Sequence, residues 1–169
     1  MNKIILGLFV TIIVVSSCLK TSDTCERTDS TVTAPASQVT DVQNYLTANS
    51  ITATPHASGF FYSITTTGSG TSIANLCTSL AVKYVGKLTN GNIFDQTAVG
   101  TTATFVLWQV IVGWQKALPM ISKGGKIKLY IPPALGYGAT PVTDGTGAVV
   151  IPANSILIFD VELIEISNL

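Results

Sequence analysis

The sequence predicts an α+β domain in which an antiparallel sheet half wraps around one short helix. Apolar and polar residues alternate in 80–88 and 155–166, which is the pattern of strands with one buried face. Between these strands, the stretch 110–121 carries apolar residues at helical spacing. Because that stretch is flanked by two further predicted strands, 103–107 and 125–131, we expect its helix to lie in the concave face of the sheet.

The predicted helix at 110–121 organises the rest of the chain. One indole and three aliphatic side chains follow one another at steps of three, four and three residues: Ile111, Trp114, Leu118 and Ile121. A helix places all four on one face, and that face must be covered. Trp114 then lies at the bottom of the concavity, either as a core residue with no further role or as the floor of a pocket.

The first 17 residues have the composition of a secretory signal. Lys3 precedes an apolar run over 4–15, and small residues follow it. This pattern is typical of a cleaved signal rather than of a membrane-spanning helix. Residues 15–18, Val-Ser-Ser-Cys, resemble the lipobox of bacterial lipoproteins, in which the signal is removed and the new terminal cysteine is lipidated. We therefore expect a lipoprotein signal at 1–17 and lipidation of Cys18, with a secreted protein and an incidental cysteine as the alternative.

Lipidation of Cys18 predicts a protein that is anchored to a membrane without spanning it, because two or more acyl chains on one residue anchor stably. Leu19 stands where inner-membrane lipoproteins of enterobacteria carry aspartate. We therefore expect the cell envelope of a Gram-negative-type bacterium, at the outer membrane and on its periplasmic or surface side. Residues 18–37 are rich in Thr, Ser, Asp and Ala and are interpreted as a flexible tether.

Residues 38–57 are predicted to form an N-terminal helix and a linker. Ser37 is the expected N-cap and Asn49-Ser50 the expected end. We expect this helix to pack on the outside of the domain that follows, 58–169. The helix is predicted from four residues at helical spacing: Val39, Val42, Tyr45 and Leu46.

Cys25 and Cys77 remain as a pair once Cys18 is lipidated. In an oxidising compartment a disulfide between them is the preferred interpretation, and two free thiols are the alternative. The bond would close a loop of roughly fifty residues, which in the chain-entropy model stabilises the fold by on the order of 4 kcal/mol. We expect no metal site from two cysteines and one distant histidine, and no cofactor.

The domain is predicted to begin with strands at 60–65 and 80–88, and Tyr84 lies on the inward face of the second. Asn90-Gly91 then predicts a hairpin turn, because both residues tolerate positive φ. The chain returns through Ile93-Phe94-Asp95, which brings an aromatic ring and a carboxylate beside the strand it left.

The second half of the domain continues the sheet. Gly124-Gly125 is the expected cap of the helix, and Pro132-Pro133 ends the next strand. That strand is predicted to have one wet face, formed by Lys126, Lys128 and Tyr130. The stretch 134–154 is predicted to be irregular, and a loop this long in a compact domain is often functional.

The composition excludes several classes of protein. The chain has nine basic and nine acidic residues, and loss of Lys3 with the signal leaves eight against nine. Without a basic excess, nucleic acid is not an expected partner. The single histidine, His56, belongs to no catalytic pattern with a serine or a cysteine. The chain instead offers one carboxylate, Asp95, among an aromatic set typical of an apolar binding site: Tyr84, Phe94, Trp114, Tyr137 and Phe159.

Six motifs, as a set and in this order, resemble the FKBP-type peptidyl-prolyl cis/trans isomerases over roughly 58–166. They are VKYVGKL at 82–88, NG at 90–91 with FD at 94–95, VIVGW at 110–114, PPALGYG at 132–138, IP at 151–152 and IFDVEL at 158–163. The resemblance implies an FKBP-like antiparallel sheet half wrapped around a short α-helix. It also implies isomerase activity in an apolar pocket, without a nucleophile.

Position by position, the resemblance implies a pocket with Trp114 as its floor. The Tyr137 hydroxyl and the Ile111 backbone N–H are expected to bind substrate carbonyls. Some of these residues also have a purely structural reading, as core residues or as a brace for the hairpin. The expected catalytic residues are Asp95, Tyr137, Trp114 and Phe94, and the expected substrate-binding residues are Tyr84, Val110, Ile111, Ile151 and Phe159.

Three departures from the family pattern bear on activity. Ala103 replaces an aromatic wall residue of some members, Trp108 stands where glycine is common, and the loop 139–150 is longer than usual. The expected function is a monomeric, lipid-anchored isomerase that assists proline-containing envelope proteins to fold. The alternatives are a non-catalytic proline-peptide-binding or chaperone lipoprotein on the same fold, and a purely structural lipoprotein.

Overall fold

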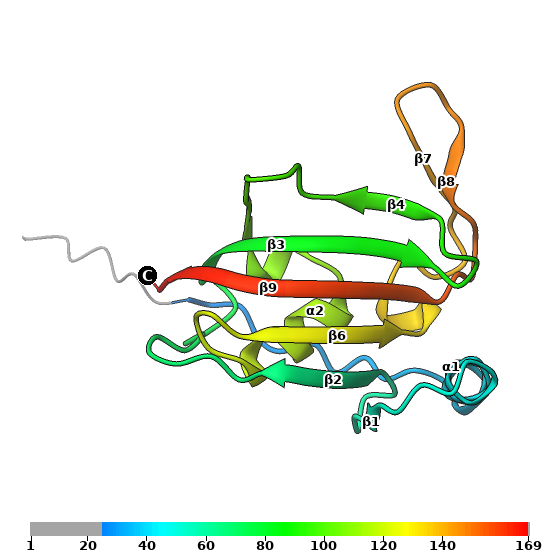
Figure 1. The fold of residues 1–169 in the computed structure, drawn as a ribbon, viewed down its shortest axis with the longest axis horizontal. Coiled ribbons are helices and arrows are strands. Elements are labelled where there is room, and N and C mark those ends of the chain that lie inside the picture. The colour runs from blue at the N-terminus through cyan, green and yellow to red at the C-terminus, as the bar shows by residue number, and fades with distance from the viewer. Residues whose placement is uncertain (1–24, 169) are drawn as a thin grey trace, which may run out of the picture.

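The computed structural model describes residues 25–168 (Figure 1). The predicted signal 1–17 and the predicted lipidation site Cys18 lie outside the described residues. No helix in the described part is long and apolar enough to cross a membrane. Over this range the helices and strands are, in order, α1 (Ala36–Ala48), β1 (Thr54–Pro55), β2 (Phe61–Thr66), β3 (Ser79–Leu88), β4 (Ile93–Gln96), β5 (Ala103–Val106), α2 (Val112–Ala117), β6 (Lys126–Ile131), β7 (Val142–Thr143), β8 (Val149–Ile151) and β9 (Leu157–Ser167). Short 3-10 turns lie at Leu107–Gln109, Leu118–Met120 and Pro133–Leu135.

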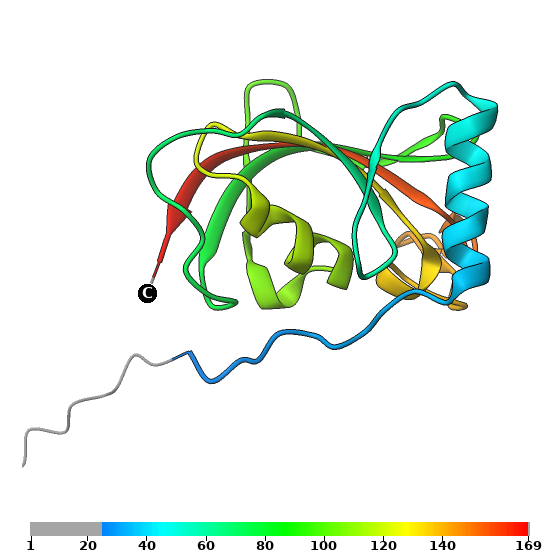
Figure 2. The same ribbon diagram turned by 90° about the horizontal axis from the view of Figure 1, so that it is seen from below.

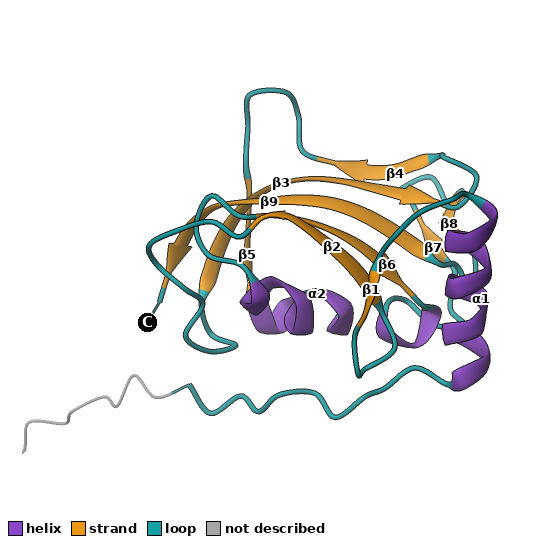
Figure 3. Cartoon of the chain, turned by 60° about the horizontal axis from the view of Figure 1, so that its bottom comes forward, coloured by secondary structure: helices purple, strands orange, loops and turns teal. Residues whose placement is uncertain are grey.

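Seven strands form one antiparallel sheet in the order β1-β2-β6-β9-β3-β4, with β5 also paired to β3. The long strand β9 lies between β6 and β3 and pairs with both along most of its length. Seen from below, the sheet arches over α2 (Figures 2 and 3). The predicted antiparallel sheet half wrapped around a short helix is confirmed.

The main core lies between the concave face of the sheet and α2. Trp114, Leu118 and Ile121 are 4%, 0% and 2% exposed, as their spacing predicts. Ile111, at the N-cap of α2, is only half-buried. Gly113 allows the helix to approach β6 closely, because a Cβ at this position would lie 2.7 Å from the Ile131 side chain. The helix turn is therefore pressed against the sheet beside the tryptophan.

A second, smaller core lies on the opposite face of the sheet, under α1. Val42 and Leu46 of α1 are 0% and 1% exposed and pack against the sheet residues Phe61, Tyr130 and Ile158. The helix thus packs on the outside of the domain, as expected. Tyr130 was expected on the wet face but is only 3% exposed, because α1 covers that end of the sheet.

Two predicted boundaries are wrong. α1 begins at Ala36 with Pro35 at its N-cap, so Ser37 does not cap it. The helical segment in the concave face ends at Met120 with an extended Ile121, and Gly124, at φ +80°, lies in the following turn rather than at the helix end. Gly124 does not cap the helix because the 3-10 turn Leu118–Met120 ends it before that residue.

The predicted irregular stretch 134–154 contains a hairpin, β7–β8, which projects from the domain (Figure 1). The Asp144 carboxylate closes its tip by accepting hydrogen bonds from the backbone N–H groups of Thr146 and Ala148. The two strands are too short for alternation to predict them.

Residues 25–35 form an extended arm that runs along the domain on the side of α2 away from the sheet (Figure 2). Lys116 of α2 donates a hydrogen bond to the Ser30 carbonyl at 2.5 Å, and Ala34 N–H donates to Ser58 at 2.9 Å. This part of the predicted flexible tether is therefore held against the domain. Its attachment uses backbone carbonyl and N–H groups, which leave no side-chain pattern in the sequence.

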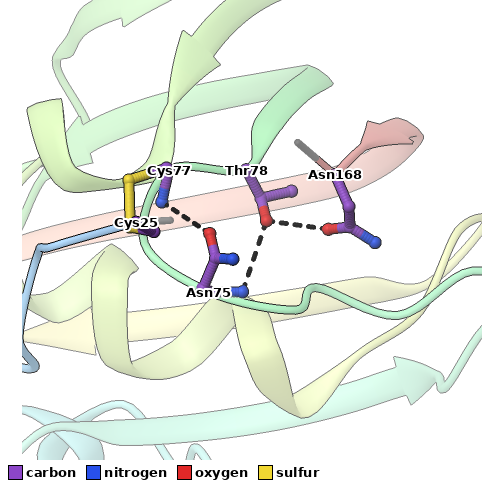
Figure 4. Close-up of a disulfide and its surroundings, with 5 residues drawn as sticks. All are labelled: Cys25, Asn75, Cys77, Thr78 and Asn168. Carbon is purple, nitrogen blue, oxygen red and sulfur yellow. Dashed lines mark hydrogen bonds between the residues drawn. A yellow bond between two sulfur atoms is a disulfide. The ribbon is translucent and has the colours of Figure 1, made fainter. Parts of the chain in front are cut away.

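The arm begins at a disulfide between Cys25 and Cys77, with a Cα–Cα distance of 5.7 Å (Figure 4). The loop that carries Cys77 is itself fixed, because Cys77 N–H donates to the Asn75 side chain at 2.9 Å. The Thr78 hydroxyl donates to the Asn168 side chain at 2.7 Å, which ties the same loop to the end of the chain. The structure thus has the pairing that the sequence favoured, anchored at a rigid position.

Candidate functional site

An aromatic cavity of about 210 Å³ opens between α2, β4, β5 and the turn after β6. The concave sheet and the short helix leave this space because α2 covers only part of the sheet. The cavity is lined by Tyr84, Phe94, Asp95, Phe105, Gln109, Val110, Ile111, Trp114, Tyr137 and Phe159.

Trp114 forms the floor of this cavity. Its ring meets Tyr84 edge to face at 5.4 Å and 86°, and meets Phe159 at 5.2 Å and 78°. Phe94 is in turn edge to face with Phe159 at 5.5 Å. Such contacts favour a fixed arrangement of rings. The indole Nε1 of Trp114 is buried and has no acceptor among the described residues.

Gly86 on β3 makes room for these rings. A Cβ there would lie 2.7 Å from Phe94 and 2.9 Å from Phe159. Gly86 also pairs with Asp95 across the β3–β4 ladder. The Asn90-Gly91 turn sets this register, so the hairpin delivers Phe94 and Asp95 to the cavity together.

Among residues 25–168, Asp95 is the one charged residue that lines the cavity, and Tyr84 binds it. The Tyr84 hydroxyl donates a hydrogen bond to Asp95 Oδ2 at 2.5 Å. Burial, followed by this hydrogen bond, raises the pKa of Tyr84 well above its ordinary value. The phenol therefore remains a neutral donor, and the carboxylate keeps one orientation.

Two further polar groups have no partner within residues 25–168. The Tyr137 hydroxyl makes no hydrogen bond there, and its side chain is 43% exposed at the cavity. Burial, and then the charge of Asp95, raise the pKa of Tyr137, so its hydroxyl stays protonated. The Ile111 N–H, at the N-cap of α2, donates to no described acceptor, whereas the Ile111 carbonyl accepts from Trp114 N–H at 2.9 Å. Both donors are free for a ligand.

The segment that carries Val110 and Ile111 is fixed by Gln115. Its Nε2 donates to the Val110 carbonyl at 2.8 Å and to the Trp108 carbonyl at 3.2 Å. Both carbonyls lie in the connection from β5 to α2. This rim of the cavity is therefore tied to the helix that carries its floor.

The structure brings all the predicted pocket residues to this cavity except Ile151. Ile151, on β8, is 3% exposed and packs in the main core, and it is not among the residues that line the cavity. Sequence reasoning missed Phe105 and Gln109. Phe105 could have been found, because it alternates with Thr104 on β5 and shares the inward face with Ala103. Its ring lies 6.0 Å from Trp114, so β5 supplies an aromatic wall although Ala103 is small.

The long loop does not cover the cavity. None of residues 139–150 lines it, and the hairpin β7–β8 points away from the domain. A larger hollow of about 300 Å³ lies on the outer face of the sheet, where Lys128 pairs with Asp160 at 2.9 Å and Lys126 with Glu162 at 3.4 Å. Its ion pairs suit an apolar ligand less well than the aromatic cavity does.

Nothing in the described part resembles a metal centre, because no three His, Cys, Asp or Glu side chains gather in residues 25–168. The arrangement offers an apolar hollow, one oriented carboxylate and two free donors. These groups can bind a ring-shaped apolar side chain and the carbonyls next to it.

Residues 70–164 match the family described as "FKBP-type peptidyl-prolyl cis-trans isomerase". The chain belongs to this family. A curated relative, the FKBP-type peptidyl-prolyl cis-trans isomerase FkpA of Buchnera aphidicola subsp. Schizaphis graminum, is 46% identical over 114 residues, which are 67% of this chain and 43% of the relative. The chain thus matches less than half the length of this FKBP-type relative.

Two solved structures confirm the FKBP-like fold. Escherichia coli FkpA superposes with a TM-score of 0.65 at 34% identity, covering 78% of this chain and 60% of that one. A peptidyl-prolyl cis-trans isomerase from Pseudomonas syringae pv. tomato superposes with a TM-score of 0.65 at 30% identity, covering 80% of this chain and 98% of that one.

Proposed function

We propose that this FKBP-type chain is a peptidyl-prolyl cis/trans isomerase that acts on proline-containing polypeptides in the aromatic cavity. The observation that carries the proposal is the cavity itself: an indole floor, edge-to-face aromatic walls, and unpaired donors at Tyr137 and Ile111. A prolyl ring is apolar and compact, and the carbonyl groups beside it need donors. The cavity supplies both.

The chemistry requires no nucleophile or metal. Rotation of an amide costs about 18 to 20 kcal/mol because resonance is lost in the twisted state. The twisted amide is less dipolar than the planar amide, so a water-poor pocket disfavours the ground state relative to the transition state. Lowering the barrier by about 5 kcal/mol accelerates rotation by nearly four powers of ten.

The residues have distinct proposed tasks. Trp114 and the surrounding rings hold the prolyl ring and exclude water. Ile111 N–H and the Tyr137 hydroxyl hold substrate carbonyls, which fixes one side of the bond while the other turns. Asp95, oriented by Tyr84, presents its carboxylate to the bond region.

A protease-coupled assay on a short Xaa-Pro peptide tests this function. We expect the wild-type protein to accelerate isomerisation, Tyr137→Phe and Asp95→Val to reduce kcat/KM, and Tyr45→Phe on α1 to leave it unchanged. A folded wild-type protein that gives the buffer rate would contradict the proposal. Peptide binding without acceleration would instead support the alternative of a non-catalytic proline-binding lipoprotein.

We also propose that the protein works as a lipoprotein of the cell envelope, where it assists the folding of envelope proteins. The support is the signal-like segment 1–17 and the lipobox-like residues that end at Cys18. Metabolic labelling with an alkyne fatty acid tests this. We expect labelling and membrane fractionation of the wild-type protein and neither for Cys18→Ala. Labelling that persists in Cys18→Ala would contradict it.

A further inference from the structure

An arginine on the arm lies on a tryptophan near the cavity. The Arg27 guanidinium carbon is 4.2 Å from the centroid of the Trp108 ring, within the range of a cation–π contact. Trp108 is 38% exposed, and Arg27 is exposed as well. The ion pairs among residues 25–168 all use lysines, so Arg27 has no carboxylate partner there. A guanidinium held by a cation–π contact rather than by a carboxylate keeps N–H donors for another acceptor.

Trp108 belongs to the rim of the cavity. It lies in the 3-10 turn Leu107–Gln109, and the next two residues, Gln109 and Val110, line the cavity. Trp108 N–H donates to the Leu76 carbonyl at 2.9 Å, and its carbonyl accepts from Gln115 at 3.2 Å. The ring is thus attached to a backbone segment that has little freedom to move.

The arm holds Arg27 over this ring from both sides. Cys25, two residues before Arg27, is bonded to Cys77, which follows the Leu76 that binds Trp108. Ser30, three residues after Arg27, accepts a hydrogen bond from Lys116 of α2 at 2.5 Å. The disulfide and this hydrogen bond therefore bracket the arginine, and the bracket uses the same loop and helix that support the cavity rim.

We infer that Arg27 and Trp108 form a subsite beside the proline cavity that favours clients with an acidic side chain near the proline. The inference rests on the proposed function. Each residue of an extended client advances its backbone by about 3.3 Å, so a residue a few positions from the proline passes the rim. Arg27 offers paired N–H donors to a carboxylate. Glu26 and Asp29, the acidic residues on the arm beside Arg27, make no ion pair with it.

Matched peptides that differ only by glutamate or glutamine near the proline test the subsite. Isomerisation is followed without protease, by exchange NMR, and the quantity is the ratio of kcat/KM for the two peptides. Because one exposed ion pair is involved, we expect the wild-type ratio to favour glutamate by about two- to fivefold at low salt. High salt should bring the ratio toward one.

The variants separate this subsite from the activity itself. Arg27→Gln should bring the ratio to one and leave the rate on the glutamine peptide unchanged. Lys83 is an exposed cation on the outer face of the sheet, and Lys83→Gln should leave the ratio as in wild type. The pair Cys25→Ser and Cys77→Ser, checked for folding by circular dichroism, should lower the ratio. A ratio of one in wild type, or a ratio that Arg27→Gln does not change, overturns the inference. If neither peptide is isomerised, the proposed function fails. The subsite is then tested by calorimetry, from the ratio of the dissociation constants of the glutamine and glutamate peptides in wild type and in Arg27→Gln.

Discussion

The Tyr84 hydroxyl on β3 donates a hydrogen bond to Asp95 on the neighbouring strand β4, with an oxygen–oxygen distance of 2.5 Å. The two residues lie on opposite sides of the Asn90-Gly91 turn, and both line the aromatic cavity. The bond therefore joins a wall of the cavity to the only charged residue that lines it in the described part of the chain. Its loss should affect the site more than the fold.

Tyr84→Phe removes this donor and keeps the ring. Hydrogen bonds to charged groups contribute about 1.5 to 3 kcal/mol, so we expect kcat/KM to fall by about tenfold or more as the carboxylate loses its orientation. The free energy of unfolding at neutral pH should fall only by the contribution of this hydrogen bond, since the ring still packs on Trp114. Tyr62→Phe on β2, away from the cavity, is the matched control. Equal kcat/KM for Tyr84→Phe and wild type would show that the orientation of Asp95 by Tyr84 does not contribute to catalysis.

The stability of the protein should depend on Tyr84 at alkaline pH. Burial, and then the bond to Asp95, raise the pKa of Tyr84 above its ordinary value of about 10. A raised folded-state pKa means that the contribution is present below pH about 10 and is lost as pH rises through the folded pKa. The difference in unfolding free energy between wild type and Tyr84→Phe should therefore be constant at neutral pH and shrink above pH about 10. A difference that grows with alkaline pH would contradict this assignment.

The disulfide should contribute strongly to stability. Cys25 and Cys77 are 52 residues apart, and closing such a loop is worth on the order of 4 kcal/mol in the chain-entropy model. We expect urea unfolding of the wild-type protein to show a loss of about 2 to 4 kcal/mol when a reductant is added. The Cys25→Ser, Cys77→Ser variant should have the unfolding free energy of the reduced protein, and the reductant should not change it. No effect of reductant on the wild-type protein would argue for two free thiols.

Gly86→Ala should close the cavity from the side of the sheet. The added Cβ meets Phe94 at 2.7 Å and Phe159 at 2.9 Å, so one ring has to move toward the cavity. Overpacking of this kind costs about 1 to 3 kcal/mol, and we expect weaker binding of a proline peptide by calorimetry as well. Gly145→Ala is the control, because nothing lies within 4 Å of its Cβ. Wild-type affinity in Gly86→Ala would show that the Phe94 and Phe159 positions do not matter.

Most of the fold and of the cavity could be predicted, because alternating apolar and polar residues indicate strands with one buried and one solvent-exposed face. Tyr84 and Phe159 were placed inward on this basis, and Trp114 by helical spacing. Tyr130 could not be placed, since its burial depends on α1, which is distant in the sequence. Ile151 was assigned from the family resemblance alone, and it is not among the residues that line the cavity.

The arm was missed for a different reason. Residues 25–35 have the composition of a linker, and their attachment to Lys116 and Ser58 uses backbone groups. Composition reports which side chains are available and says nothing of backbone hydrogen bonds. Arg27 and Trp108 lie far apart in the sequence, and the Cys25–Cys77 disulfide and the Lys116–Ser30 hydrogen bond bring their regions together.

The most direct test follows the Trp114 indole N–H and the cis–trans exchange of an Xaa-Pro peptide by NMR in one sample. We expect the indole resonance to shift as the peptide binds, and catalysed exchange peaks to appear at the same peptide concentrations. Exchange at the buffer rate, or catalysis that leaves the Trp114 indole resonance unshifted, would contradict the claim that the Xaa-Pro bond isomerises in the cavity above Trp114.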